Sequence, residues 1–194
     1  MDHYFVYTDG SCSNNGKSNA KAGIGVYFGN NDSRNVSERI SGKQTNNRAE
    51  LLAILKAGQI IGKDNVTIVS DSEYAIKCVT TYGKKCQDNQ WETKIANKEL
   101  VKEVYDFFQG KSIDFKHVYS HTSKQDIHSL GNEQADKLAT KVVGISSVSK
   151  KIYLNVPYQK KDHAKSLGAK WDPSKKKWYT ENDSSELLTL YKIE

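Results

Sequence analysis

The chain has 194 residues, of which 37% are hydrophobic, which is enough for one medium domain, or one domain plus a small appendage. The N-terminal apolar stretch is too short for a secretory signal, and no apolar run approaches the length of a membrane span. The three cysteines form no Cys-x-x-Cys pair. We therefore expect an intracellular protein of the cytoplasm or nucleus, not secreted and without membrane contact. The net charge is +6, and residues 150–194 hold ten Lys and Arg against six Asp and Glu, so the C-terminal end is the basic part.

The first three quarters of the chain alternate between strand and helix patterns. Apolar and β-branched runs bounded by turn residues predict five strands, over residues 4–8, 23–28, 36–40, 66–69 and 113–118, with the first strand stopped by Asp9-Gly10. Apolar residues at spacings of three and four predict helices over residues 47–61, 72–80, 98–108 and 133–143. The order of these elements predicts an α/β fold, with an antiparallel meander followed by parallel pairing in a mixed sheet.

A Ser-rich stretch separates a second, smaller segment. We expect residues 1–144 and 151–194 to be two domains, joined by a linker at 145–150. The second segment predicts a small α+β module: an alternating run over 151–156, a helix over 159–167 and an aromatic hairpin that ends at Trp178-Tyr179. Between residues 150 and 177, nine lysines with interleaved Tyr and Trp accompany only two aspartates, which favours nucleic-acid binding. A solvated lysine-rich surface is an equally good interpretation.

Four short motifs each contribute one carboxylate. They are Thr8-Asp9-Gly10-Ser11, Asn46-Asn47-Arg48-Ala49-Glu50-Leu51, Ser70-Asp71-Ser72-Glu73-Tyr74 and Gly131-Asn132-Glu133-Gln134-Ala135-Asp136. Each carboxylate lies beside a predicted strand end or helix start, where a fold can gather them. Clustered carboxylates repel one another unless cations hold them. Two Mg²⁺ ions roughly 3.5 to 4 Å apart would satisfy such a cluster and support phosphodiester hydrolysis, so the sequence predicts a nuclease.

Each carboxylate taken alone has a simpler interpretation. Asp9 can start a turn, and Asp136 can be a solvated helix residue. Glu50 can close a capping box with Asn47, and Asp71 can cap the helix that follows it. Only their joint placement in the four motifs favours a cluster.

Residues 1–144 resemble type 1 ribonuclease H, an endonuclease that cuts RNA in RNA/DNA hybrids. Five motifs in family order carry the resemblance: Tyr7-Thr8-Asp9-Gly10-Ser11-Cys12, Ala22-Gly23-Ile24-Gly25-Val26-Tyr27, Gln44-Thr45-Asn46-Asn47-Arg48-Ala49-Glu50, Ser70-Asp71-Ser72 and Gly131-Asn132-Glu133-Gln134-Ala135-Asp136. The resemblance implies a ribonuclease H-like five-stranded mixed sheet with flanking helices. It also implies two-metal hydrolysis that leaves 5′-phosphate and 3′-hydroxyl ends.

The resemblance assigns a role to each carboxylate. It implies that Asp9 bridges two Mg²⁺ ions, for which Mn²⁺ can substitute, with Asp136 on the nucleophile side and Glu50 and Asp71 on the leaving-group side. The family also places a catalytic histidine on a loop before the last aspartate. His121 stands in that position after the last predicted strand, while His128 lies in what we interpret as an insertion in the loop. We favour His121, although either histidine can be a surface residue.

Contacts with an RNA/DNA hybrid are also implied by the resemblance. Asn15, Asn46 and Asn47 are expected to line the RNA strand, since amide side chains suit the 2′-hydroxyl, and Cys12 is expected to contact the substrate. Lys43, Thr45 and Asn97 are expected to bind a phosphate of the DNA strand, although Asn97 can equally be a helix cap. The segment 80–96 resembles the basic handle of the family and supplies Tyr82, Lys84, Lys85 and Trp91. Trp91 can equally be a core residue, and Tyr82 and Cys86 stand where relatives often have tryptophan.

The C-terminal segment resembles a small domain appended to primases and other DNA-processing proteins. We hypothesise that it tethers nucleic acid to the catalytic domain, which we expect to act as a monomer. Two other functions stay open at this point. A DNA nuclease or transposase-like enzyme would share the carboxylate chemistry, and a catalytically silent binding module would share the fold.

Overall fold

The computed structural model describes residues 4–61, 65–120, 126–144, 152–173, 175–180 and 186–191. The chain divides into two compact units, residues 1–145 and residues 146–194. The predicted linker at 145–150 lies outside the described residues. Within the described ranges, no helix combines the length and the apolar character that crossing a bilayer requires.

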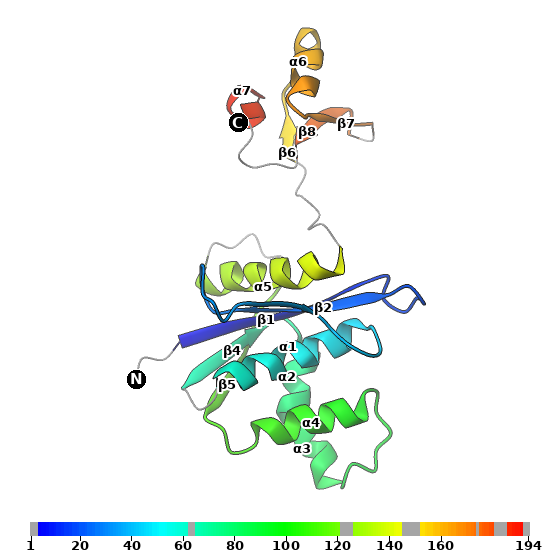
Figure 1. The fold of residues 1–194 in the computed structure, drawn as a ribbon, viewed down its shortest axis with the longest axis vertical. Helices are drawn as coiled ribbons and strands as arrows, with labels where there is room; N and C mark the ends of the chain where they lie inside the picture. Colours follow the sequence, from blue (N-terminus) through cyan, green and yellow to red (C-terminus); the bar gives the residue numbers. More distant parts are fainter. Residues whose placement is uncertain are drawn as a thin grey trace. The chain divides into compact units, whose positions relative to one another are not determined.

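The first unit is built on a five-stranded mixed sheet. Its strands are β1 (Tyr4–Ser13), β2 (Lys21–Tyr27), β3 (Val36–Arg39), β4 (Val66–Ser70) and β5 (Ile113–His117). They lie in the order β3-β2-β1-β4-β5 (Figure 1). Pairing is antiparallel between β1, β2 and β3, and parallel between β1, β4 and β5. The predicted fold class, a meander followed by parallel strands, is confirmed.

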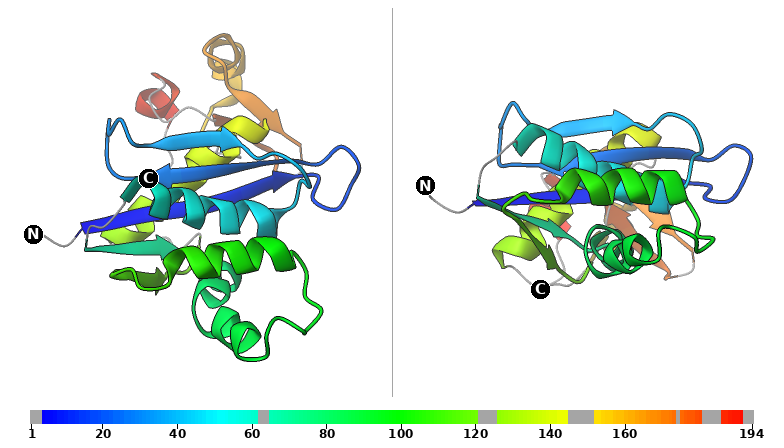
Figure 2. Two further views of the ribbon diagram at one scale, coloured as in Figure 1. Left: turned by 60° about the horizontal axis from the view of Figure 1, so that its bottom comes forward. Right: turned by 90° about the horizontal axis from the view of Figure 1, so that it is seen from below.

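Helices cover both faces of this sheet. They are α1 (Asn46–Ile61), α2 (Glu73–Val79), α3 (Thr81–Asp88), α4 (Lys98–Phe108) and α5 (Ile127–Val143). Both α1 and α5 pack on β1 and β2, from opposite sides of the sheet (Figures 1 and 2). Gly25 of β2 allows α5 to approach at backbone distance, because a Cβ atom there would lie 2.0 Å from the carbonyl oxygen of Ala135. This close contact holds the helix that carries Asp136 beside the central strands.

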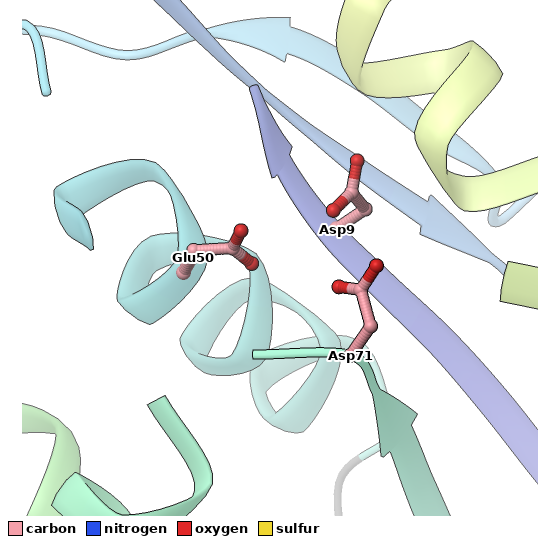
Figure 3. A group of neighbouring side chains, drawn as sticks. All are labelled: Asp9, Glu50 and Asp71. Atoms are coloured by element: carbon pink, nitrogen blue, oxygen red, sulfur yellow. The ribbon is translucent and has the colours of Figure 1, made fainter. Parts of the chain in front are cut away.

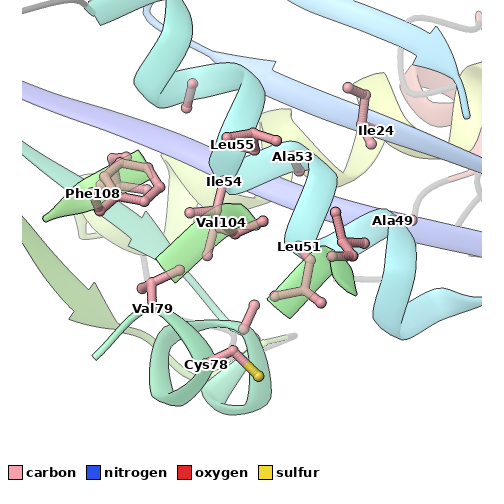
Figure 4. Packing of buried hydrophobic residues seen from close by; sticks show 14 of the residues in the cluster. Ile24, Ala49, Leu51, Ala53, Ile54, Leu55, Cys78, Val79, Val104 and Phe108 are labelled. Carbon is pink, nitrogen blue, oxygen red and sulfur yellow. The ribbon is translucent and has the colours of Figure 1, made fainter. Parts of the chain in front are cut away.

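The main core lies between the sheet and the helices α1, α2 and α4. Apolar residues at helical spacing in α1, among them Leu51, Ile54 and Leu55, are buried against Val104 and Phe108 of α4 (Figure 4). The same cluster includes Cys78 of α2, which forms no disulfide. This packing fixes α1 on the sheet and with it the position of Glu50.

Three elements differ from the sequence predictions. The strand β1 does not stop at Asp9-Gly10 but continues to Ser13, because β2 still pairs with it after β4 has ended. The helix α5 begins at Ile127 rather than near residue 133, because the Asp126 side chain accepts hydrogen bonds from the backbone N–H groups of His128 and Ser129 and so caps an earlier turn. The short helix α3 was not predicted.

The second unit has its own three-stranded sheet and small core. Its elements are β6 (Ile152–Leu154), the 3₁₀ turn η1 (Tyr158–Lys160), α6 (Lys161–Ser166), β7 (Lys170–Asp172), β8 (Lys177–Thr180) and α7 (Glu186–Tyr191). The strands are antiparallel in the order β6-β8-β7. Leu154, Ala164, Ala169 and Leu187 form the buried core. The predicted hairpin and central helix are present, while α7 is an addition.

Candidate active site

Three of the four predicted carboxylates meet at one end of the main sheet. Asp9, Glu50 and Asp71 each offer an oxygen atom within 4.8 Å of the other two. Their side chains point toward one another from β1, α1 and the end of β4 (Figure 3). Asp9 and Glu50 are buried, with 7% and 6% of their surface exposed, and Asp71 is partly exposed. The cluster therefore opens to solvent on the side of Asp71.

The parallel pairing of β1 and β4 brings the two aspartates together. The ladder between these strands ends at the pair Thr8 and Ser70, and the next residue on each strand is an aspartate of the cluster. Asp9 is kept in the sheet by β2, where it lies opposite Gly25. A position just past the carboxyl ends of parallel strands is a common place for a ligand site in α/β proteins.

Gly10 positions Glu50. Its backbone N–H donates a hydrogen bond to Glu50 Oε2 at 3.0 Å. A Cβ atom at Gly10 would lie 2.2 Å from the backbone nitrogen of Glu50, so only glycine permits this approach of α1 to β1. Asn46 Nδ2 donates to the other carboxylate oxygen at 3.3 Å. The alternative that Glu50 closes a capping box with Asn47 is wrong, because its carboxylate faces β1 and Asn46.

Asp71 is held by two residues that sequence reasoning missed. Asn132 Nδ2 of α5 donates to Asp71 Oδ2 at 3.1 Å, and His117 Nε2 lies 3.2 Å from the backbone carbonyl oxygen of Asp71. Asn132 belongs to the motif that supplies Asp136, so its place in that motif was the available signal. The helix-cap alternative for Asp71 is wrong, because Ser72 Oγ caps α2 by accepting from the N–H of Ala75.

Asp136 joins the cluster through Asp9. It lies on α5, partly buried, and its negative charge and side chain raise the pKa of the Asp9 carboxyl group. It is outside the tight group of three oxygen atoms but adjacent to the same central carboxylate. Asp9 therefore interacts with Asp136 as well as with Glu50 and Asp71, so Asp136 is not simply a solvated helix residue.

Burial, and then the concentration of negative charge, raises the pKa values of Asp9 and Glu50. Burial raises the pKa of Asp9 well above its usual range, and the charges of Asp71 and Asp136 raise it further. Burial likewise raises the pKa of Glu50, with Asp9 and Asp71 adding to the effect. Backbone hydrogen bonds from Gly10 act in the opposite direction at both groups but do not offset it. The cluster in its ionised form therefore needs a cation.

The donor set fits a divalent metal ion. Carboxylate oxygens are hard ligands, of the kind that Mg²⁺ and Mn²⁺ take. The buried Oδ1 atom of Asn132 also has no hydrogen-bond partner among the described residues, which leaves an oxygen free beside Asp71. Among the described residues, these carboxylates are the cluster with metal-binding geometry.

Comparison with protein families decides the affiliation of this unit. Residues 1–144 match the RNase H family, and residues 151–188 match DUF5710, a domain of unknown function. The chain belongs to the RNase H family. The resemblance seen over residues 1–144 is thereby confirmed, whereas the likeness of the C-terminal segment to modules of primases stays a prediction.

Curated relatives agree with the family assignment. The chain is 41% identical to ribonuclease H of Schizosaccharomyces pombe over 143 residues, which cover 71% of this chain and 52% of that protein. It is 37% identical to human ribonuclease H1, over 71% of this chain and 49% of the relative. With ribonuclease H of Orientia tsutsugamushi it shares 33% identity, over 70% of this chain and 79% of the relative. The chain thus spans about half the length of the first two relatives.

Solved structures share the fold. The solution structure of the PFV RNase H domain matches with a TM-score of 0.58 at 22% identity, covering 72% of this chain and 93% of that domain. A crystal structure of LC9-RNase H1, described as a type 1 RNase H with the type 2 active-site motif, gives a TM-score of 0.55 at 24% identity, over 72% of this chain and 71% of that one. These likenesses support the RNase H fold independently of sequence.

Residues predicted to read RNA lie next to the RNase H cluster. Asn15 Oδ1, in the turn after β1, accepts a hydrogen bond from the backbone N–H of Asn46 at 3.3 Å. Asn46 in turn contacts Glu50, so the amide of Asn15 is connected to the carboxylates through one residue. Asn47 is exposed on the first turn of α1, and Cys12 is partly buried on β1. The structure therefore connects Asn15 and Asn46 to the cluster, and the role of all four residues in RNA binding stays a prediction.

The residues predicted to bind a DNA phosphate lie at the starts of two helices, α1 and α4. Thr45 Oγ1 accepts a hydrogen bond from the N–H of Arg48 at 3.4 Å at the start of α1. Lys43 is exposed in the preceding turn. Asn97 stands before α4 in a left-handed conformation with φ of 56°, and its side chain makes no capping hydrogen bond. Asn97 thus occupies the N-cap position of α4 without a side-chain cap, and its role in phosphate binding stays a prediction.

Of the four handle residues predicted to contact substrate, three are exposed and one belongs to the core. Tyr82 and Lys85 are exposed on α3, and Lys84 forms an exposed ion pair with Asp88 at 3.1 Å. Trp91, in contrast, is only 8% exposed, and its ring packs against that of Tyr105 at 6.1 Å. The expectation that Trp91 contacts substrate is corrected in favour of the core alternative, because its ring is covered by the protein.

The two candidate histidines differ in what the structure says of them. His121 lies outside the described residues. His128 lies on the first turn of α5, not in a loop, with its ring 4.6 Å from that of Phe5 and Nδ1 3.4 Å from the hydroxyl of Tyr7. Burial lowers the pKa of His128, and the charge of Lys116 adds to this. These contacts make His128 a packed residue of the β1–α5 contact.

Proposed function

We propose that the chain is an endonuclease that hydrolyses the RNA strand of RNA/DNA hybrids, with two Mg²⁺ ions per site. The observation that carries the proposal is the group of Asp9, Glu50 and Asp71 with oxygens within 4.8 Å, in a unit that belongs to the RNase H family. Buried acids with raised pKa values have no structural use without a cation. When bound, the divalent ions activate a water molecule and neutralise charge on the phosphate.

The chain's own residues divide the work around Asp9. Asp9 is proposed as the shared ligand, because it belongs to the oxygen group with Glu50 and Asp71 and its pKa also responds to Asp136. Asp136 then serves the side on which water attacks, and Glu50 and Asp71 serve the side on which the 3′-oxygen leaves. Gly10 and Asn46 hold Glu50 in position, and Asn132 holds Asp71.

Recognition of the hybrid is proposed to use polar groups beside the cluster. Asn15, Asn46 and Asn47 offer amides that can both donate to and accept from a 2′-hydroxyl, which only the RNA strand carries. Lys43, Thr45 and Asn97 are proposed to bind a phosphate of the DNA strand, and Lys84 and Lys85 to extend this contact. The two strands would thus be distinguished by different residues.

The histidine that assists proton transfer or product release is proposed to be His121. His128 is held between β1 and α5 by Phe5 and Tyr7, so it lacks the freedom of a loop residue. We expect His121→Ala to lower kcat by about a hundredfold or more, the usual range for loss of a proton-transfer group, and His128→Ala to change it little. Single-turnover and steady-state cleavage of a hybrid would measure both, and the reverse ranking would reject the assignment.

A substrate panel tests the proposed specificity. A labelled RNA strand is supplied in an RNA/DNA hybrid, in an RNA duplex and alone, beside a DNA duplex and single-stranded DNA, all with Mg²⁺. We expect cleavage of the hybrid RNA only, with 5′-phosphate and 3′-hydroxyl ends. Cleavage of the DNA duplex would indicate a DNA nuclease instead. Tight binding of the hybrid without cleavage in Mg²⁺ or Mn²⁺ would indicate a silent binding module.

A further inference from the structure

The C-terminal unit contains a groove that no carboxylate of the active site contributes to. It encloses about 640 Å³, within the range of ligand-binding sites. Two kinds of side chain dominate its lining: aromatic rings and lysines, namely Tyr158, Trp171, Trp178, Lys161, Lys176 and Lys177. Among the described residues that line the groove, none is acidic.

An exposed tryptophan forms one wall of the groove. Trp171 of β7 and Trp178 of β8 are direct cross-strand partners, with ring centroids 5.5 Å apart at 63°. Trp178 also packs against the small core, next to Leu154 of β6. Trp171 is 49% exposed, so a large part of its apolar ring is in contact with water. A large aromatic surface left open beside a second ring is typical of a contact site.

A second aromatic surface of the groove is provided by Tyr158, in the segment just before α6. Tyr158 is 77% exposed at the start of the 3₁₀ turn η1. The Nζ atom of Lys161 lies 4.3 Å from the centroid of the Tyr158 ring and donates a hydrogen bond to its hydroxyl at 3.2 Å. A positive charge is thus held against an aromatic face that is open to solvent.

The lysines of the β7–β8 turn are held in place by a buried acid. Asp172 is 6% exposed, and its carboxylate accepts hydrogen bonds from the backbone N–H of Lys175 at 3.2 Å and from the hydroxyl of Tyr153 at 3.0 Å. Lys176 follows with a φ of 50°, a conformation that non-glycine residues rarely adopt. Lys176 and Lys177, the first residue of β8, are both exposed and line the groove.

We propose that this groove binds single-stranded nucleic acid, with an unpaired base stacked on Trp171 and backbone phosphates held by Lys161, Lys176 and Lys177. A single strand presents an aromatic face and a negative charge in every nucleotide, which is the combination that the groove offers to bind. A duplex hides its base faces, so it would use the lysines but leave Trp171 and Tyr158 open to water. An acidic peptide would likewise use only the charges.

The test uses the full chain and a labelled oligo(dT) strand of about 15 nucleotides, a length that one small module can contact. Fluorescence anisotropy is measured without divalent ions, so that the carboxylate cluster cannot hold the strand through a metal. We expect Trp171→Leu to weaken binding by about tenfold, because leucine keeps apolar surface but loses the stacking face. Trp171→Phe should keep most of the affinity, which also shows that a change at this position leaves the unit folded.

A pair of double variants separates the groove from general charge. Lys176→Gln with Lys177→Gln removes two charges from the groove, and Lys160→Gln with Lys165→Gln removes two exposed charges that do not line it. We expect only the first pair to weaken binding, and to reduce the slope of log affinity against log salt by about 1.4, since each single-strand phosphate contact contributes about 0.7. The second pair should behave as wild type.

Three results would overturn the proposal. Equal loss in the two lysine pairs would mean that binding follows net charge and not the groove. Binding of oligo(dT) that is unaffected by Trp171→Leu would mean that no base stacks there. Preference for a duplex of the same length, with Trp171→Leu unaffected, would assign the lysines to duplex phosphates instead. Since no active-site residue is changed, each outcome is independent of whether the chain cleaves RNA.

Discussion

The two units of this chain both gather side chains of like charge, but the first unit buries most of them and the second leaves most of them exposed to solvent. In the first unit, Asp9 and Glu50 are buried and, with Asp71, form a group within 4.8 Å. In the second, exposed lysines surround an open aromatic groove. Buried like charges raise the free energy of the fold unless a cation joins them, so the first cluster implies a ligand by its energetics alone. Exposed lysines cost little in water, so the second site is inferred only because aromatic rings stand open beside them.

The largest expected effect comes from breaking the contact that builds the first cluster. Gly10→Ala would place a Cβ atom 2.2 Å from the backbone nitrogen of Glu50, so α1 must move away from β1. We expect a loss of roughly 3 kcal/mol or more in the free energy of unfolding, as for other overpacked core sites, and a loss of cleavage of at least about a hundredfold. Urea unfolding and hybrid cleavage would measure both effects.

Gly29→Ala is the matched control, because a Cβ atom there meets nothing within 4 Å. It should leave stability and cleavage close to wild type. If Gly10→Ala behaved like Gly29→Ala, the close approach of α1 and β1 would not be what positions Glu50.

A second prediction concerns pH in the absence of metal. The pKa values of Asp9 and Glu50 are raised in the folded state, first by burial and then by neighbouring acids, so the folded chain binds more protons than the unfolded chain above the ordinary carboxyl range near 4. The free energy of unfolding should therefore fall as pH rises through the window from that ordinary value to the raised ones. Thermal or urea unfolding in EDTA across that window measures the slope.

Asp9→Asn sharpens the same prediction. It removes one of the repelling charges, so at neutral pH without metal we expect the variant to be more stable than wild type and less dependent on pH. Addition of Mg²⁺ should stabilise wild type and have a smaller effect on the variant, because binding to the folded state raises its stability. Equal stabilisation of both by Mg²⁺ would show that the ion binds elsewhere.

The smallest expected effect concerns the basic unit. Removal of residues 150–194 should raise KM for a hybrid severalfold and flatten its salt dependence, while kcat changes less, because the lysines supply phosphate contacts and no catalytic group. Steady-state kinetics at several salt concentrations would separate these quantities. An unchanged KM would mean that the second unit does not assist binding of the hybrid.

Much of the fold could be predicted from local patterns. The helix α4 (Lys98–Phe108) was predicted to the residue, because its apolar residues follow helical spacing and its ends carry breaking residues. The end of β1 could not be predicted from local patterns. Gly10 signals a turn locally, but in the structure it makes a contact with Glu50 of α1, forty residues later in the chain. The start of α5 was placed too late, because its first turn depends on the side-chain cap at Asp126.

The site shows the same division between local and tertiary information. The four carboxylates were found because each belongs to a motif. The support from Asn132 and His117 to Asp71 was missed, since it comes from contacts across 61 and 46 residues of sequence. Trp91 was assigned to substrate binding from the resemblance to the handle, with the core as the alternative, and its ring is buried against that of Tyr105. Composition could not distinguish these settings.

The most direct test of the central claim is cleavage of a labelled RNA/DNA hybrid by wild type and by Asp71→Asn, as a function of Mg²⁺ concentration. Asp106→Asn, which changes an exposed aspartate of α4, controls for charge. We predict that wild type and the control cleave the RNA strand only when Mg²⁺ is present, and that Asp71→Asn is reduced by about a thousandfold or more. Cleavage by wild type in EDTA, or full activity of Asp71→Asn, would contradict a metal-dependent carboxylate cluster.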